Sequence, residues 1–299
     1  MASLEYTTRE RLDVLLMKKY PDFSRAFLQK LCSEDKVLVD GVPRKSGYKL
    51  QGGETVLPLH DMKSIIGLVP DIDLPILYED NNVIVINKPA GVLSHGLSKF
   101  LGEPSVASFL RQRHIASQKG EWKAEDLRFG IVHRLDRVTS GVMICAKNQE
   151  TMRFLQKQFH DRKVQKTYRA LVEGELKLPE ALLDLPIERN PKAPATFRVG
   201  PNGKTAQTTY KVIKTYASDD VVISLVELTP KTGRTHQLRV HLLHIKHPII
   251  GDKLYKGREA DRLYLHAFKL TIEIPGLGEK TFNATMPKEF EELVGTDER

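Results

Sequence analysis

The sequence predicts an α+β fold, with a small N-terminal αβ module and a larger body built on a mainly antiparallel mixed sheet with flanking helices. Three observations support this prediction. The length of 299 residues corresponds to about two domains of roughly 100–200 residues each. Hydrophobic residues make up 40% of the chain, which is enough to form cores. The strand-like segments of the body outnumber its few helical segments, which favours antiparallel pairing over a doubly wound parallel sheet.

The N-terminal module is predicted to cover residues 1–62. The helical spacing of Leu12, Leu15 and Leu16 indicates a first helix, which the proline at position 21 stops. A second helix is expected to run from the N-cap residue Ser24 to about position 32. Three short strands separated by glycine-containing turns follow, at about 37–39, 42–43 and 55–59.

Residues 63–75 contain two prolines and no clear period, so they are predicted to form an interdomain linker. The body then covers residues 76–299. Its expected helices lie at about 105–113, with Ser105 as N-cap, and at 150–160, 235–245 and 288–294. Its expected strands lie at about 76–78, 83–86, 129–132, 142–146, 165–174, 195–199, 205–214, 221–229, 263–274 and 280–285.

Composition narrows the class of protein. The chain has two cysteines, far apart in sequence, so a disulfide scaffold is excluded and a reducing compartment is favoured. No stretch approaches the roughly 18 apolar residues of a membrane span, and the first residues lack the apolar core of a secretory signal. We therefore expect a soluble cytoplasmic protein that does not bind membranes.

Positive charge is concentrated in three segments of the body. The formal charge is +8, but residues 137–170, 191–214 and 229–258 together carry +17, which leaves the rest of the chain at −9. Such clustering favours a face that binds a polyanion, with nucleic acid ahead of lipid. The alternative is a set of solvated surfaces that never meet in space.

Two loops combine residues suited to chemistry. In residues 133–141, Asp136 lies between two arginines, which favour its ionised form and suit it to act as a nucleophile or base. A simple loop salt bridge is the alternative. In residues 231–241, Gly233 breaks a strand and Thr235 is expected to cap the next helix, which would place Arg234 at an anion-binding helix N-terminus.

Two further patterns leave alternatives open. Tyr168 lies between cations in a strand, where it would stack on a nucleobase or serve as an ordinary sheet residue. His241, His244 and His247 are spaced three residues apart, which raises the possibility of zinc. The pattern lacks the H-E-x-x-H arrangement and a nearby cysteine or aspartate ligand, so no metal is expected. Glycine-rich phosphate loops are absent, so no cofactor is expected either.

Several segments together resemble the RluA-type RNA pseudouridine synthases, a family that isomerises uridine to pseudouridine in RNA. The segment G-I-V-H-R-L-D-R-V-T-S-G at 130–141 is similar to the catalytic signature of that family. Four other segments resemble further sequence elements of that family: I-N-K-P-A-G at 86–91, K-T-Y-R-A at 166–170, T-G-R-T-H-Q-L-R-V-H at 232–241 and H-P-I-I-G-D at 247–252. The N-terminal module resembles an S4 RNA-binding domain. One departure is His95-Gly96, where many members have His-Pro.

The resemblance implies a pseudouridine synthase fold and a set of roles. Asp136 corresponds to the essential aspartate, and Arg234 to a basic residue expected to pair with it. Tyr168 corresponds to the tyrosine that stacks on the target base and that is also a candidate to take a proton. The aspartate would either attack C1′ or remove the C2′ proton. Cations of the motifs and of the S4-like module are expected to contact RNA: Arg25, Lys30, Arg134, Arg137, Lys166, His236 and Arg239.

The resemblance to members that carry an S4 domain implies a large-subunit ribosomal RNA substrate and a protein that acts as a monomer without cofactor or metal. Transfer RNA is an alternative target. Two other classes remain open at this point: a non-catalytic RNA-binding or ribosome-assembly protein, and a metal-dependent hydrolase that would use the histidine cluster.

Overall fold

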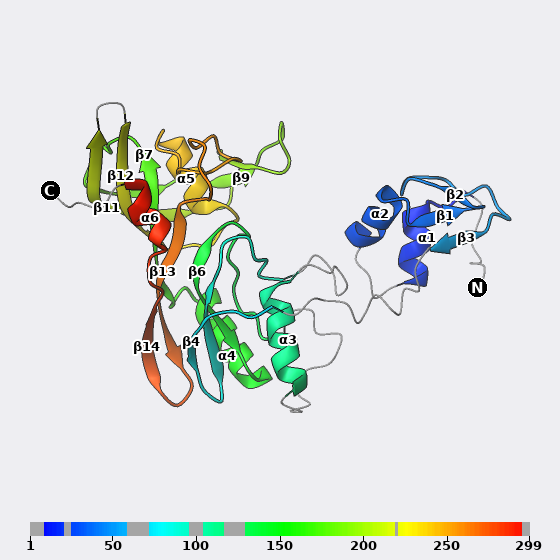
Figure 1. The fold of residues 1–299 in the computed structure, drawn as a ribbon, viewed down its shortest axis with the longest axis horizontal. Helices are drawn as coiled ribbons and strands as arrows, with labels where there is room; N and C mark the ends of the chain where they lie inside the picture. The colour runs from blue at the N-terminus through cyan, green and yellow to red at the C-terminus, as the bar shows by residue number, and fades with distance from the viewer. Residues whose placement is uncertain are drawn as a thin grey trace. The chain divides into compact units, whose positions relative to one another are not determined.

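The computed structural model describes residues 9–20, 25–58, 72–95, 104–116, 129–218 and 221–294 (Figure 1). The chain divides into two compact units. The first comprises Met1–Asp73 and His95–Phe129, and the second comprises Leu74–Ser94 and Gly130–Arg299.

The first unit contains a small αβ core. Helices α1 (Leu12–Lys19) and α2 (Arg25–Ser33) accompany an antiparallel sheet of β1 (Val37–Val39), β2 (Val42–Pro43) and β3 (Val56–Pro58), with β1 in the centre. Apolar side chains of both helices and of the sheet are buried together, among them Leu12, Leu16, Leu28, Val37 and Val56. The two helices and three strands expected from the sequence are confirmed. The expected cap Ser24 and strand end Leu59 lie outside the described residues.

Helix α3 (Val106–Ala116) also belongs to the first unit. Its N-terminus is closed by two serines: Ser108 N donates to Ser105 Oγ at 3.2 Å, and Ser105 N donates to Ser108 Oγ at 2.8 Å. This reciprocal pairing satisfies backbone donors that the first turn leaves free, so the predicted N-cap is confirmed.

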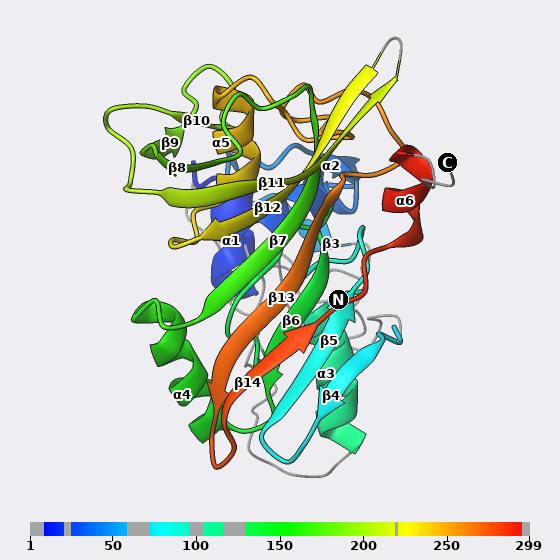
Figure 2. The same cartoon turned by 90° about the vertical axis from the view of Figure 1, so that its left-hand side faces the viewer.

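The second unit is built on a nine-stranded sheet, which Figure 2 shows in full length. Eight strands lie in the order β4 (Ile76–Glu79), β5 (Val83–Lys88), β6 (Ser140–Ala146), β13 (Leu265–Ile274), β7 (Gln165–Glu173), β12 (Val221–Pro230), β11 (Gln207–Ser218) and β8 (Glu180–Asp184). The ninth, β14 (Gly278–Asn283), pairs with β13. Only β6 and β13 are parallel among these pairs. The expected mainly antiparallel mixed sheet is confirmed.

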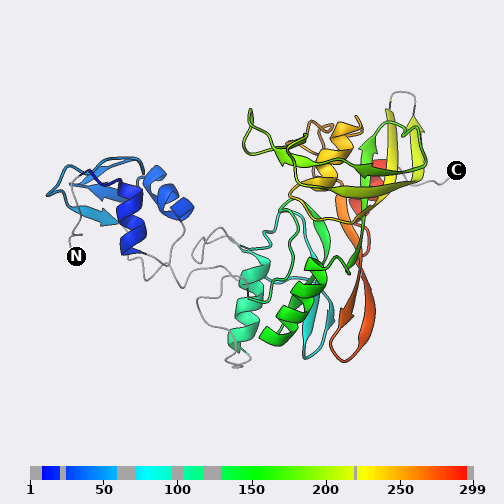
Figure 3. The same ribbon diagram turned by 180° about the vertical axis from the view of Figure 1, so that it is seen from behind.

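Helices cover this sheet in two places. Helix α4 (Gln149–His160), green in Figure 3, packs against β6 and β13 and buries Leu155 beside Val142 and Ile144. Helix α5 (Gln237–His244) contributes Leu238 and Leu242 to a second core, which also takes Phe290 of α6 (Lys288–Val294). A two-stranded ribbon of β9 (Ile187–Arg189) and β10 (Phe197–Val199) contacts α5.

The structure corrects the expected strand at 129–132. Phe129 and Gly130 have φ angles of 31° and 80°, so the backbone turns, and only Ile131 makes an isolated bridge to Cys145. Two strands were not predicted, β8 and β9, because they are short and largely exposed and lack a strong apolar alternation.

Candidate active site

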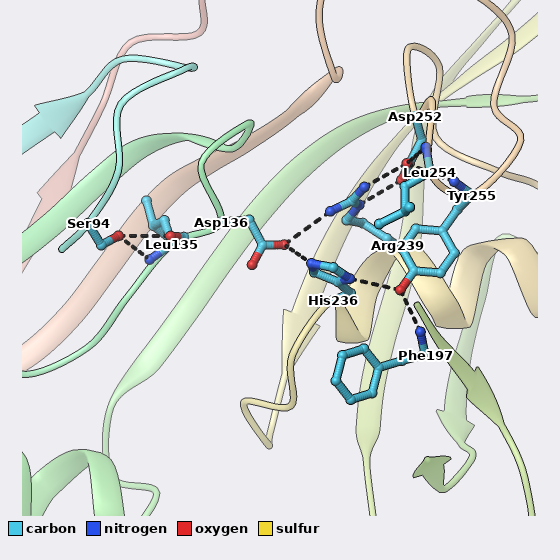
Figure 4. Close-up of polar contacts among 9 residues, drawn as sticks. All are labelled: Ser94, Leu135, Asp136, Phe197, His236, Arg239, Asp252, Leu254 and Tyr255. Atoms are coloured by element: carbon cyan, nitrogen blue, oxygen red, sulfur yellow. Dashed lines mark hydrogen bonds and ion pairs between the residues drawn. The ribbon is translucent and has the colours of Figure 1, made fainter. Parts of the chain in front are cut away.

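The loop that precedes β6 carries Asp136, and several contacts hold this loop in place. Leu135 N donates to Ser94 Oγ at 3.1 Å, and the same hydroxyl donates back to Leu135 O at 2.8 Å (Figure 4). The buried ammonium of Lys88 donates to Val92 O at 2.8 Å and to Arg137 O at 3.3 Å. These bonds fix the backbone on both sides of Asp136.

A glycine permits the loop to end where it does. Gly141 has a φ of 118°, and a Cβ built there would lie 2.2 Å from Ala267 O of β13. Only glycine allows the start of β6 to approach β13 this closely. This requirement explains the glycine that closes the T-S-G sequence.

His133 anchors the other end of the loop. Ile144 N donates to His133 Nε2 at 3.1 Å, and the imidazole stacks on Phe159 of α4 with a centroid distance of 4.6 Å. Burial lowers the pKa of His133 to about 3. The ring is therefore neutral, with its proton on Nδ1, and connects the loop to β6 and α4.

Asp136 faces a buried arginine. Arg239 Nη1 lies 3.5 Å from Asp136 Oδ2, while Arg239 Nε and Nη2 each donate to Asp252 at 2.7 Å (Figure 4). The Arg239 side chain is 6% exposed, Asp252 is fully buried, and Asp136 is 22% exposed. Burial would lower the pKa of Arg239, but hydrogen bonds and charge from Asp252 and charge from Asp136 raise it. Arg239 therefore remains a cation beside the more exposed carboxylate.

His236 is the second neighbour of Asp136. Its Nε2 lies 3.9 Å from Asp136 Oδ2, and its Nδ1 lies 2.8 Å from the hydroxyl of Tyr255. Phe197 N donates to that hydroxyl at 3.0 Å, so the hydroxyl proton is available for His236 Nδ1. Burial lowers the pKa of His236. The chain of bonds thus favours a neutral ring that directs its Nε2 proton towards Asp136.

The expected pairing of Arg234 with Asp136 is wrong. Arg234 Nε donates to Thr205 O at 2.9 Å, and Arg239 occupies the position beside Asp136. The expected cap is also wrong: the N-cap of α5 is His236, with a φ of 56° and no side-chain cap hydrogen bond. Because His236 has a left-handed backbone conformation, α5 begins at Gln237. Arg239 therefore lies in the first turn of α5, and Arg234 lies before the helix.

A cavity of about 590 Å³ opens beside Asp136. Tyr168 of β7 lines it, and burial together with the nearby Asp136 charge raises the pKa of Tyr168. Its phenol therefore stays protonated at neutral pH. Most of the predicted site residues line this cavity: Arg134, Asp136, Lys166, Tyr168, Arg234, His236 and Arg239.

Three predicted RNA contacts lie elsewhere. Arg137 is not in the cavity lining, and its Nε donates to Gly91 O at 3.0 Å. In the first unit, Arg25 binds the buried carboxylate of Asp13 through Nε at 3.0 Å and Nη2 at 2.9 Å. Lys30 of α2 forms an ion pair at 3.7 Å with Glu34, which follows the end of that helix.

Asp252 and Tyr255 are site residues that sequence reasoning missed. Asp252 does appear in the segment H-P-I-I-G-D, which was noted as a family element without a role. Tyr255 carries no such signal, because its contact with His236 depends on how the chain folds back after α5.

The three histidines His241, His244 and His247 do not all lie on one helix. His241 is in α5 and contacts Thr208 Oγ1 at 3.0 Å and Leu185 O at 2.9 Å through its two ring nitrogens. His247 lies beyond the end of α5 and contacts Glu173 O at 2.7 Å. In the described part of the chain, no group of three or more candidate ligands is arranged to hold a metal ion.

A carboxylate in a cavity lined by cations is typical of an enzyme site that accepts an anionic substrate, and comparison with known proteins identifies the family. Residues 82–244 match the family described as RNA pseudouridylate synthase, and residues 10–56 match the S4 domain. The family match covers more than half of the chain. The protein belongs to the RNA pseudouridylate synthase family and is an RNA pseudouridine synthase.

Individual relatives cover most of the chain. It is 37% identical to the ribosomal large subunit pseudouridine synthase D of Borreliella burgdorferi, over 96% of this chain and 90% of that one. It is 33% identical to the protein of the same name in Escherichia coli, over 95% and 90%. The human RNA pseudouridylate synthase domain-containing protein 4 has a similar structure, with a TM-score of 0.57 and 27% identity over 72% of this chain and 90% of that one.

No helix among the described residues is both long and apolar enough to cross a membrane.

Proposed function

We propose that this synthase modifies uridines of large-subunit ribosomal RNA and that Asp136 carries the chemistry. The observation that supports the role of Asp136 is a difference in exposure. Asp136 is partly exposed and lines the cavity, while its cationic partner Arg239 is buried. The names of the relatives support the ribosomal substrate. Residues 1–62 then act as an RNA-binding module, and residues 76–299 as the catalytic domain after a linker at 63–75.

The reaction requires the target uridine to leave its stack and enter the cavity. The N1–C1′ bond breaks, the uracil turns and C5 bonds to C1′. The C5 proton is lost to solvent, and N1, now free of the sugar, takes up a proton from solvent. Asp136 acts at the sugar, either by attack on C1′ or by removal of the C2′ proton. Arg239 orients Asp136 before it reacts.

Tyr168 supports the base rather than transferring a proton. Its raised pKa leaves it a neutral phenol, which is a poor base at neutral pH. A partly buried aromatic ring in the same cavity as the reacting carboxylate instead provides a surface on which the detached uracil can stack. Holding the ring near C1′ preserves the proximity needed for the second bond.

The protein is proposed to act as a monomer. Arg134, Lys166 and His236 would contact the RNA inside the cavity, and Arg25, Lys30 and Arg137 would contact it elsewhere. An enzyme of ribosomal RNA is expected to work in the cytoplasm.

Release of tritium tests the proposal. Unmodified large-subunit ribosomal RNA and transfer RNA, both labelled with 5-tritiated uridine, are incubated with the wild type and with Asp136→Asn. We expect release from the ribosomal RNA alone and only with the wild type, and sequencing then maps the modified uridine. Binding without release would support a non-catalytic RNA-binding protein, and release from transfer RNA alone would change the substrate.

A further inference from the structure

The cavity contains an ammonium group without a counter-ion. Lys166 of β7 lines the cavity and is partly buried, and burial lowers the pKa of this lysine. In the described residues its Nζ has neither a hydrogen bond nor an ion pair, and Asp136 is the only carboxylate in the cavity lining. A desolvated cation without a partner is costly, so such a group indicates a place where an anion binds.

The space in front of this ammonium is open because residue 233 is glycine. A Cβ built on Gly233 would have a single neighbour within 4 Å, the Nζ of Lys166 at 3.9 Å. The φ of Gly233 is outside the left-handed region, so the backbone itself does not require glycine here. What the glycine provides is room beside Lys166.

Arg234 lines the same cavity directly after this glycine. Its Nε is held by Thr205 O at 2.9 Å, which fixes the guanidinium and leaves its terminal nitrogens to other partners. A fixed guanidinium and an ammonium that line the same cavity can together match the oxygens of a phosphate. Binding of a phosphate here would give a role to Arg234, which lines the cavity but does not contact Asp136.

The location relative to Tyr168 identifies which anion belongs here. Lys166 and Tyr168 are two residues apart on β7, so their side chains point to the same face about 7 Å apart. A base stacked on Tyr168 would therefore bring the sugar–phosphate backbone of the same nucleotide close to Lys166.

We propose that Lys166, the open side of Gly233 and Arg234 form a phosphate-binding pocket, which holds a backbone phosphate flanking the flipped uridine. This inference rests on the proposed function, because it assumes that a uridine enters the cavity. It assigns to Lys166 and Arg234 a defined part of the substrate in place of a general attraction to RNA.

Titration with inorganic phosphate tests the pocket without RNA. In a ¹⁵N-labelled full-length protein, phosphate should shift the amide resonances of Gly233 and Arg234 in the wild type. The shift should disappear in Lys166→Met and persist in Lys163→Met, a variant of an exposed lysine three residues away that does not line the cavity. The absence of a shift in the wild type, or an equal shift in Lys166→Met, would overturn the proposal.

Methylphosphonate substitution tests the same pocket with RNA. A stem–loop that contains the mapped uridine is prepared with a neutral methylphosphonate on its 5′ or 3′ side. At one of these positions the wild type should lose about tenfold to hundredfold in affinity, in line with the loss of a charge-assisted hydrogen bond. Lys166→Met should lose as much with the unmodified RNA and nothing further with the substituted RNA.

Additive losses in Lys166→Met would show that the phosphate binds elsewhere and would overturn the proposal. Gly233→Ala provides an independent check, since its methyl group would fill the space beside Lys166 without backbone strain. It should weaken RNA binding while the thermal midpoint stays unchanged. If the wild type shows the phosphate shift but releases no tritium from any RNA, the pocket stands and the proposed function fails.

Discussion

The two units of this protein both contain an ion cluster of carboxylate and arginine, but the exposure of the partners is reversed. In the first unit the carboxylate of Asp13 is fully buried, and its partners Arg11 and Arg25 are 46% and 51% exposed. In the second unit Arg239 is 6% exposed, and its partner Asp136 is 22% exposed towards the cavity. One cluster presents cations and the other presents a carboxylate.

The exposed partner indicates what each cluster is for. Burial alone would raise the pKa of Asp13, but hydrogen bonds from Arg11, Gln29 and Arg25 lower it well below its usual range. That buried anion fixes two arginines, which we propose contact an RNA backbone. In the second unit Asp252 anchors Arg239, which in turn fixes Asp136 for chemistry. We therefore propose that one kind of ion pair serves binding in the first unit and catalysis in the second.

The largest effect expected is that of Asp136→Asn. Loss of the reacting carboxylate should reduce isomerisation by about 10⁴-fold or more, while RNA affinity stays within about threefold. Tritium release and filter binding measure the two quantities, and Asp184→Asn, an exposed residue of β8, serves as the control. Substantial turnover by folded Asp136→Asn would refute the assignment of the carboxylate.

Asp252→Asn should have the next largest effect. It removes the charge that anchors Arg239 and should reduce kcat by about a hundredfold while lowering the free energy of unfolding by about 3 kcal/mol.

Asp13→Asn breaks the corresponding anchor of the first unit and should weaken RNA binding with kcat unchanged. Equal effects of the two variants on kcat would erase the contrast between the clusters.

Acidification should weaken the second unit before the first. The folded pKa of His133 is about 3, below its unfolded value, so its contribution to stability falls as pH drops below about 6.5, by roughly 2 kcal/mol at pH 5. The folded pKa of Asp13 is lowered, so its contribution is lost only below about pH 4.

Hydrogen exchange of β6 and β1 amides at pH 7 and 5, corrected for intrinsic rates, measures this difference. His133→Gln should remove much of the pH dependence in β6, and the control His244→Gln, a change of an exposed histidine, should keep it. Parallel loss of protection in both strands at pH 5 would contradict the expectation.

The smallest effect expected is that of Arg25→Ala. Loss of one phosphate contact should weaken RNA binding about threefold to tenfold and reduce the salt slope by about 0.7 to 1. The single-turnover rate at saturating RNA should not change. Titrations at several salt concentrations check this, with the exposed Lys280→Ala of β14 as control. A changed rate at saturation would assign Arg25 a part in catalysis.

The sequence by itself predicted most of the local elements and singled out the residues proposed for the site. The apolar spacing of Leu12, Leu15 and Leu16 was sufficient to predict α1, and the loop around Asp136 was recognised because its residues are contiguous. Tyr168 was predicted as a site residue in the same way, from the contiguous motif K-T-Y-R-A at 166–170. Such features depend on neighbours in the chain, which sequence patterns record directly.

Only the tertiary structure decided which arginine accompanies Asp136. Arg234 and Arg239 belong to the same motif, and the sequence favoured Arg234. The left-handed backbone at His236 starts α5 later and brings Arg239 to Asp136, 103 residues away in the chain. Asp252 then secures Arg239 from a third segment. Contacts between distant segments depend on where each element begins and how elements pack, which no local pattern specifies.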